Sequence, residues 1–245
     1  MLRHLVRTPS NRPESEALPM VILIHGRGAD MNDLADLAPM LDAAGGCRFV
    51  FPNAPKPFEP YPGMAMGWTW FEGWPPQHES VVESRTEMLR FIDEITEKYP
   101  TPDGKLVIAG FSQGALMSLD SGLRYVGSRT NRKLAGIICM SGGLYEADLP
   151  DLKTRAGLRV LIAHGLADDV VPINYARRAR RVLEDARLDV EYHEYPMGHQ
   201  VAMEEAEVVK GFLGRVLTTP ERVLDRDAGK FDITADFGVD PEEMP

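Results

Sequence analysis

The stretch Lys105-Leu106-Val107-Ile108-Ala109 leads directly into Gly110-Phe111-Ser112-Gln113-Gly114, and a helical pattern follows as far as Tyr125. The first five residues are apolar enough to form a buried β-strand. The next five have the form Gly-x-Ser-x-Gly, in which a sharp turn between a strand and a helix lifts the serine hydroxyl off the edge of a sheet. The glycines leave room for strand and helix to approach each other. Together the two stretches predict a strand-turn-helix unit that exposes Ser112.

Apolar runs of strand length recur on both sides of this unit, at residues 2–6, 20–24, 48–51, 134–140, 159–163 and 189–195. Helical patterns lie between them at residues 79–99, 174–186 and 200–217. The central runs are apolar on both faces, as strands of a parallel sheet covered on each side must be. This alternation predicts an α/β fold with one mostly parallel, doubly wound sheet and helices on both faces. We expect residues 1–217 to form this single domain.

The C-terminal segment, residues 218–245, departs from the alternation and is strongly acidic. Eight acidic and three basic side chains give it a net charge of −5, half of the −10 carried by the whole chain of 245 residues. An acidic extension of this kind is either solvated and loosely attached, or a docking element for a partner or a second subunit. Docking of a second subunit would make the protein a homodimer.

The overall composition limits partners and compartment. A net charge of −10 disfavours binding to nucleic acid and to anionic membranes. No apolar run approaches the ~20 residues that span a bilayer, and residues 1–19 lack the apolar core of a secretion signal. Cys47 and Cys139 lie in apolar runs without metal-ligand spacing, which predicts buried free thiols and no metal site. We therefore expect a cytoplasmic protein with no integral membrane segment.

A second irregular segment, residues 52–80, contains seven prolines and six aromatic residues, including all three tryptophans of the chain. A loop of this length in a compact domain is usually a functional wall or lid. It could instead plug the edge of the sheet, but its aromatic side chains favour a wall of the substrate pocket. The pocket candidates are Trp68, Trp70, Phe71 and Trp74, together with His25, which follows a core strand and precedes a glycine.

A serine hydroxyl needs a base to become a nucleophile, and His199 is the best placed of the six histidines. It follows Pro196-Met197-Gly198 in a loop between the last strand and the last helix. A loop at the carboxyl edge of the sheet can hold an imidazole over the nucleophile. The acid that orients the imidazole should follow a late strand, between the serine and the histidine in the chain. Asp168 and Asp169 both satisfy this condition.

The chain order serine, aspartate, histidine is that of α/β-hydrolases. A Gly-x-Ser-x-Gly motif alone could be a serine that only caps a helix, but the three elements in this order predict a catalytic triad. The oxyanion hole, which binds the negatively charged oxygen formed in acyl transfer, is expected from the backbone N–H of Gln113 and the glycine turn at residues 24–30. A phosphate-binding loop is the weaker interpretation of this turn, because no Lys-Ser/Thr follows it.

These motifs resemble the phospholipase/carboxylesterase family of small α/β-hydrolases, which includes acyl-protein thioesterases and bacterial carboxylesterases. The matching stretches are Ile24-His25-Gly26-Arg27-Gly28, Gly110-Phe111-Ser112-Gln113-Gly114, His164-Gly165 through Asp168 to Val171-Pro172, Gly198-His199 and Trp70-Phe71-Glu72. The resemblance covers about residues 20–217. It implies an α/β-hydrolase fold, Asp168 rather than Asp169 as the acid of the triad, and the backbone amides of Arg27 and Gln113 as the oxyanion hole.

The function expected from these residues is hydrolysis of a small-molecule carboxylic ester. Ser112 would form an acyl-enzyme with His199 as base and Asp168 as its partner, without metal or organic cofactor. An acyl-thioesterase or a lysophospholipase is the nearest alternative, since triad chemistry does not identify the leaving group. A non-catalytic binding protein on a hydrolase scaffold would need a missing triad member, and none is missing from the sequence.

Overall fold

The computed structural model describes residues 1–10, 12–42, 46–125 and 133–218. The acidic C-terminal extension expected at residues 218–245 lies outside the described residues except for Thr218. No helix in these four ranges is long and apolar enough to cross a membrane. Cys47 and Cys139 are both buried free thiols.

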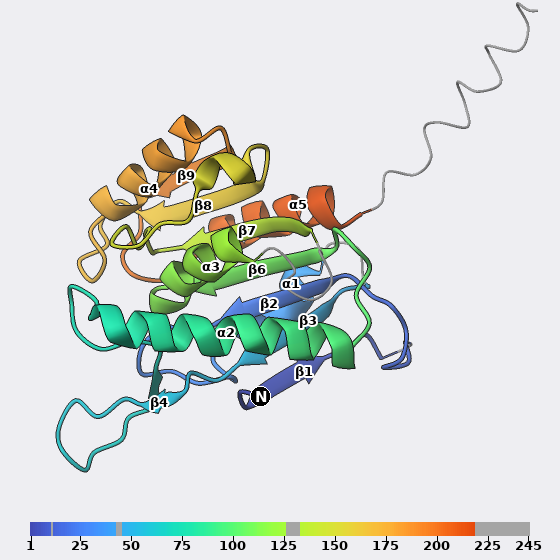
Figure 1. The fold of residues 1–245 in the computed structure, drawn as a ribbon, viewed down its shortest axis with the longest axis horizontal. Helices are drawn as coiled ribbons and strands as arrows, with labels where there is room; N and C mark the ends of the chain where they lie inside the picture. Colours follow the sequence, from blue (N-terminus) through green and yellow to red (C-terminus); the bar gives the residue numbers. More distant parts are fainter. Residues whose placement is uncertain (11, 43–45, 126–132, 219–245) are drawn as a thin grey trace, which may run out of the picture.

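Within the described ranges, seven strands form one sheet in the order β1-β3-β2-β6-β7-β8-β9 (Figure 1). β1 runs antiparallel to β3, and every other neighbouring pair is parallel. The strands are β1 (His4–Arg7), β2 (Met20–Ile24), β3 (Arg48–Pro52), β6 (Leu106–Phe111), β7 (Leu134–Met140), β8 (Arg159–Gly165) and β9 (Asp189–Tyr195). The prediction of one mostly parallel sheet is confirmed. β6 extends through Phe111, two residues further than predicted, because the sheet continues up to the serine.

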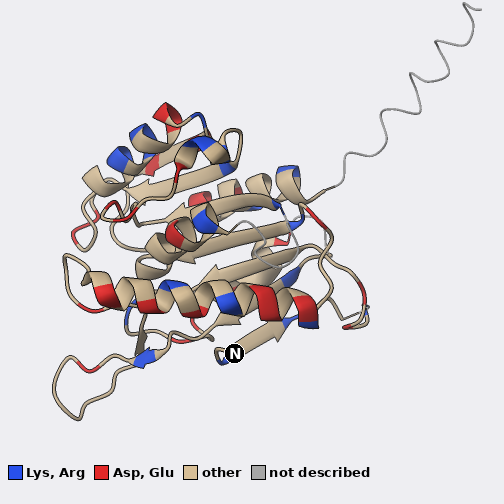
Figure 2. Ribbon diagram, viewed as in Figure 1, with Lys and Arg blue, Asp and Glu red and all other residues tan. Residues whose placement is uncertain are grey.

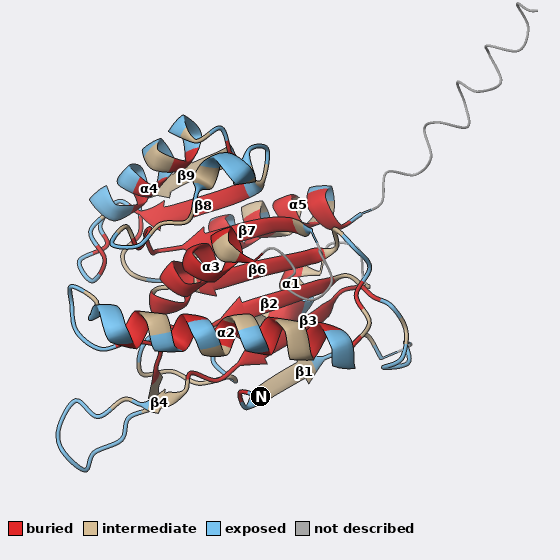
Figure 3. Ribbon diagram, viewed as in Figure 1, coloured by how far each residue is buried: buried red, intermediate tan, exposed pale blue. Residues whose placement is uncertain are grey.

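Helices cover both faces of the sheet, as predicted. α1 (Ala38–Leu41), preceded by the short 3-10 turn η1 (Ala35–Leu37), packs with α5 (Met203–Leu217) on one face. α2 (His78–Lys98), α3 (Gln113–Arg124) and α4 (Asn174–Asp185) cover the other face, and the 3-10 turn η2 (Leu152–Arg155) precedes β8. Successive residues of β2 alternate between the two layers, and all five are buried. Figure 3 shows the resulting buried centre of the sheet between partly exposed helices.

The irregular segment that was predicted at residues 52–80 contains a small hairpin. β4 (Lys56–Pro57) and β5 (Trp68–Thr69) pair in antiparallel fashion, and the loop between them projects from the body of the protein (Figure 1). β5 also pairs with the turn that follows β2, through a bridge between Ala29 and Trp68. The hairpin is therefore attached to the carboxyl edge of the sheet, where the parallel strands end.

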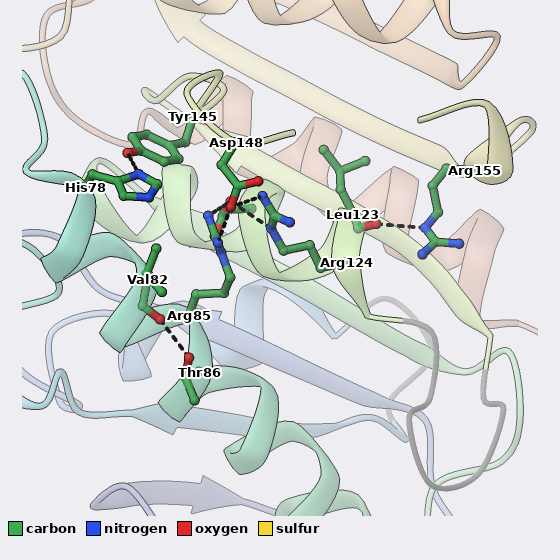
Figure 4. A network of polar contacts seen from close by, with 10 residues as sticks. His78, Val82, Arg85, Thr86, Leu123, Arg124, Tyr145, Asp148 and Arg155 are labelled. Atoms are coloured by element: carbon green, nitrogen blue, oxygen red, sulfur yellow. Dashed lines mark hydrogen bonds and ion pairs between the residues drawn. The ribbon is translucent and has the colours of Figure 1, made fainter. Parts of the chain in front are cut away.

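A buried ion-pair network fastens α2 to α3 and to the segment that follows β7 (Figure 4). Arg85 of α2 donates hydrogen bonds to both carboxylate oxygens of Asp120, at 2.6 and 3.0 Å, and a third to Asp148 at 2.8 Å. The side chains of Arg85 and Asp120 are only 9% and 1% exposed. Nearby, the ring of His78 lies 2.8 Å from the hydroxyl of Tyr145. Both links hold the segment after β7 against α2.

Replacing Arg85 should destabilise the fold strongly. The Arg85→Ala variant leaves the Asp120 carboxylate buried with only the weaker contact to Arg124, at 3.3 Å. Loss of one partner from a buried pair lowers the free energy of unfolding by about 3 kcal/mol, measurable by urea denaturation. The control is Arg90→Ala on the same helix, whose side chain is 56% exposed, with an expected loss below about 1 kcal/mol. Equal losses in the two variants would contradict the prediction.

Candidate active site

Ser112 lies in a strained turn between β6 and α3. Its backbone has φ 57° and ψ −120°, a conformation that non-glycine residues rarely adopt. The turn is so tight that a Cβ atom on Gly110 would collide with the carbonyl of Gly114, and one on Gly114 would collide with the carbonyl of Ile24. Glycine is therefore required at both positions, and the packing between strand and helix holds the serine at the edge of the sheet.

The structure brings Ser112, His199 and Asp168 together, although they are far apart in the sequence. The Nε2 atom of His199 lies 2.9 Å from the Oγ atom of Ser112. Its Nδ1 atom lies 2.8 Å from Oδ2 of Asp168. Since an ionised carboxylate accepts hydrogen bonds only, Nδ1 carries the proton and Nε2 is free to accept the serine proton. The imidazole thus has the orientation that a general base requires.

Asp168, rather than Asp169, is turned toward the histidine. Asp168 is buried and Asp169 is exposed. The Oδ1 atom of Asp168 accepts hydrogen bonds from the backbone N–H groups of Val170, at 3.0 Å, and Val171, at 2.8 Å. Burial raises the pKa of Asp168, but the hydrogen bonds from His199 and from these amides outweigh it, so the net shift is downward. The carboxylate therefore stays ionised beside the imidazole.

The turn after β2, which carries Arg27, packs against the nucleophile. A Cβ atom on Gly26 would lie 3.2 Å from the Cβ atom of Ser112. His25 fixes this turn: its Nδ1–H donates to the carbonyl of Gly26 at 2.6 Å, and its Nε2 accepts the N–H of Ala54 at 3.1 Å. Burial lowers the pKa of His25, which keeps the ring neutral and able to accept that bond. The backbone amide of Arg27 is thereby held on a rigid turn.

Two of the predicted pocket tryptophans support the same turn instead of lining a cavity. Trp70 is fully buried, and its indole N–H donates to the carbonyl of His25 at 2.9 Å. The backbone of Trp68 accepts a hydrogen bond from Gly28 at 2.8 Å and donates one to Ala29 at 2.9 Å. These contacts attach Trp68 and Trp70 to the turn after β2. His25, Trp68 and Trp70 are therefore not among the residues that line the cavity, whereas Phe71 and Trp74 are.

The side chain of Gln113 has a role that the sequence pattern did not reveal. Gln113 is the first residue of α3, a position whose backbone N–H has no partner within the helix. Its side-chain carbonyl accepts hydrogen bonds from Thr69 and from the backbone of Trp70, both at 3.0 Å, and its amide donates to Phe71 at 2.8 Å. The residue after the nucleophile therefore also anchors the aromatic segment. This role could not be predicted from the sequence, because it depends on contacts between Gln113 and residues more than 40 positions earlier in the chain.

The candidate triad opens into a cavity of about 470 Å³. Ser112, Gln113 and His199 are among its polar lining residues. Its walls are mainly apolar and aromatic, and they include Phe71, Trp74, Pro76, Leu116, Leu144, Tyr145, Val170, Val171 and Tyr175. The described part of the chain holds no cluster of three or more His, Cys, Asp or Glu side chains that could bind a metal ion.

Comparison with known sequences identifies the family to which the chain belongs. The model of the phospholipase/carboxylesterase family matches residues 10–217, so the chain belongs to that family, whose members are esterases and thioesterases. Among its relatives is acyl-protein thioesterase 1 of Mycosarcoma maydis, which is 31% identical over 242 residues, covering 87% of this chain and 98% of the relative. Acyl-protein thioesterase 1 of Neurospora crassa is 29% identical over 235 residues, covering 87% and 91%.

Solved structures support the same assignment of the fold. The esterase PE8 superimposes with a TM-score of 0.73 and 27% identity, covering 88% of this chain and 99% of that protein. The carboxylesterase of Bacillus cereus has a TM-score of 0.68 at 23% identity, covering 88% and 95%. Both confirm the α/β-hydrolase fold.

Beside the loop that carries His199, the first turn of α5 buries a carboxyl group. Glu205 is fully buried, and among the described residues neither of its carboxyl oxygens has a well-formed hydrogen bond. Burial raises its pKa to about 7 from an ordinary value of 4.5. The hydroxyl of Tyr195, whose own pKa is raised by burial and by Glu205, is also buried without a partner there. Glu205 is thus protonated below neutral pH.

This burial makes the stability of the fold depend on pH. The folded protein holds the Glu205 proton up to about pH 7, whereas the unfolded chain releases it near pH 4.5. The contribution of protonated Glu205 to the free energy of unfolding is therefore complete below pH 4.5. It is lost as the pH rises through 7, a loss on the order of 3 kcal/mol. In urea denaturation at pH 5 and pH 9, Glu205→Gln should be more stable than the wild type at pH 9 and similar at pH 5.

The neighbouring Glu204 provides the control, because it lies in the same helical turn but is exposed. Glu204→Gln should keep the pH dependence of the wild type. A Glu205→Gln variant that loses stability at pH 9 as steeply as the wild type would contradict the assignment.

Proposed function

We propose that this protein hydrolyses carboxylic esters through a covalent acyl-enzyme on Ser112. The observation that carries the proposal is the bridging imidazole of His199, 2.9 Å from the serine Oγ and 2.8 Å from the Asp168 carboxylate. That arrangement makes the serine a nucleophile at neutral pH, and the apolar cavity beside it suits an acyl group or an aromatic alcohol.

The reaction has two steps of the same kind. His199 takes the proton of Ser112 as Oγ attacks the ester carbonyl, and Asp168 stabilises the imidazolium that forms. The backbone amides of Arg27 and Gln113 bind the oxyanion. As the intermediate collapses, His199 gives its proton to the leaving alcohol. Water then attacks the acyl-enzyme with His199 again as base, which releases the carboxylic acid and regenerates Ser112.

A thioesterase activity at the same site is the second candidate. It is favoured by the relatives named acyl-protein thioesterase 1, which match this chain over 87% of its length. The chemistry differs only in the leaving group, a thiol in place of an alcohol. Comparing kcat/KM for oxygen esters and thioesters with the same acyl group distinguishes the two substrate classes.

Covalent labelling tests the nucleophile. The folded protein should form a stoichiometric adduct with a fluorophosphonate, which phosphonylates activated serines, and mass spectrometry should locate the adduct on Ser112. The Ser112→Ala variant and the heat-denatured wild type should not react. An unlabelled folded protein, or an adduct on another serine, would overturn the proposal.

Substitution of the base tests the triad. His199→Ala should lower kcat for 4-nitrophenyl esters by about three orders of magnitude or more, as is typical when a triad member is removed. The control is His193→Ala, because His193 lies half-buried in β9 and interacts with Glu191 at 3.0 Å, away from the serine. Near-complete activity in the His199 variant would rule out this histidine as the base.

A further inference from the structure

One permanently charged side chain, that of Arg27, contributes to the cavity at the candidate triad. Every other described lining residue except His199 is apolar, aromatic, glycine or an uncharged polar residue. Arg27 also borders an adjoining cavity of about 540 Å³, which Phe71 lines as well. Arg27 therefore lines both cavities, and its side chain is within reach of a substrate that extends from Ser112 toward the adjoining one.

The guanidinium of Arg27 has no acidic partner within the described part of the chain. It donates one hydrogen bond to the backbone carbonyl of Gly73, at 3.0 Å, and lies 5.9 Å from the ring centre of Phe58. Glu59 and Glu72 line the adjoining cavity, but neither forms an ion pair with it. By contrast, Arg177 binds both oxygens of Glu194, each at 2.8 Å. Arg27 thus keeps donors free for a ligand.

Arg27 is an exposed residue, but part of its side chain is removed from water by the residues around it. Partial burial lowers its pKa, and no nearby carboxylate contributes in the other direction. A cation that is partly removed from water and lacks a counter-ion gains more from an incoming anion than a fully solvated cation does. Arginine also offers a planar pair of N–H groups that matches the two oxygens of a carboxylate.

The position of Arg27 in the chain limits where that anion can be. Its backbone amide is the proposed oxyanion donor, so the side chain begins beside the ester carbonyl under attack. A carboxylate on the same small molecule as the reacting ester can then reach the guanidinium. We propose that Arg27 is a specificity-determining residue that selects ester substrates carrying a carboxylate, for example half-esters of dicarboxylic acids. This inference rests on the proposed esterase function.

Matched pairs of esters test the inference. Mono-4-nitrophenyl adipate is compared with the ester whose terminal carboxylate is replaced by a carboxamide, which places the charge on the acyl side. 4-Acetoxybenzoate is compared with 4-acetoxybenzamide, which places it on the leaving group. For at least one pair, the full chain should have a kcat/KM about tenfold higher for the anion, and added salt should reduce this ratio.

Variants of Arg27 connect the preference to its side chain. Arg27→Gln should abolish the ratio between anionic and neutral esters, whereas Arg27→Lys, which keeps the charge, should retain most of it. Arg90→Gln removes one exposed positive charge from α2 and should leave the ratio unchanged. If Arg27→Gln fails to fold, the wild-type ratios, their salt dependence and the lysine variant still test whether Arg27 causes the preference for anionic esters.

The outcomes distinguish a failure of the proposed role of Arg27 from a failure of the proposed esterase function. Turnover of the neutral esters without preference for either anion overturns the role of Arg27 and leaves the esterase intact. A preference that persists in Arg27→Gln also overturns it. Absence of turnover together with absence of fluorophosphonate labelling would overturn the esterase and, with it, this inference.

Discussion

The close approach of α3 to the sheet is the constraint on which the candidate site depends. Gly110 and Gly114 allow backbone to contact backbone where any side chain would collide, and the chain can then turn only through a strained conformation at Ser112. Strain of this kind persists only when the surrounding packing over-determines it. Here the surrounding packing is that of the central strands β2, β6 and β7, which are almost completely buried (Figure 3).

Because the strands are parallel, each delivers its following loop to the same edge as the serine. The turn after β2, the turn after β8 and the loop after β9 contribute Arg27, Asp168 and His199, and each segment is held by hydrogen bonds to its backbone. The aromatic segment has no strand in the large sheet, and it is attached by the side chain of Gln113 and by β5. Figure 2 shows that charged residues lie largely on the helices and loops, away from the central strands. The positions of the site residues are thus determined mainly by the backbone of the strands and of the loops that follow them.

The sequence was sufficient to predict the sheet, its helices on both faces and the chain order of the three candidate catalytic residues, because each depends on local periodicity or on short motifs. The residue pattern alone left Asp168 and Asp169 open, and only the family resemblance favoured Asp168, the residue that the turn geometry directs inward. The sequence also predicted that His25, Trp68 and Trp70 line the pocket. Instead, β5 pairs with the turn after β2, and these residues contact that turn and each other. The Arg85–Asp120 pair joins residues 35 positions apart and has no local signature.

The electrostatic arrangement around His199 follows from burial. His164 lies 3.4 Å from the Asp168 carboxylate and could compete with His199 for its charge. Burial lowers the pKa of His164, so its ring stays neutral, with Nε2 2.7 Å from the carbonyl of Val171. His25 is kept neutral by burial in the same way. The one imidazole that contacts both the serine and the aspartate is His199, which is partly exposed toward the cavity. Burial thus prevents the neighbouring histidines from taking up the proton that the proposed reaction assigns to His199.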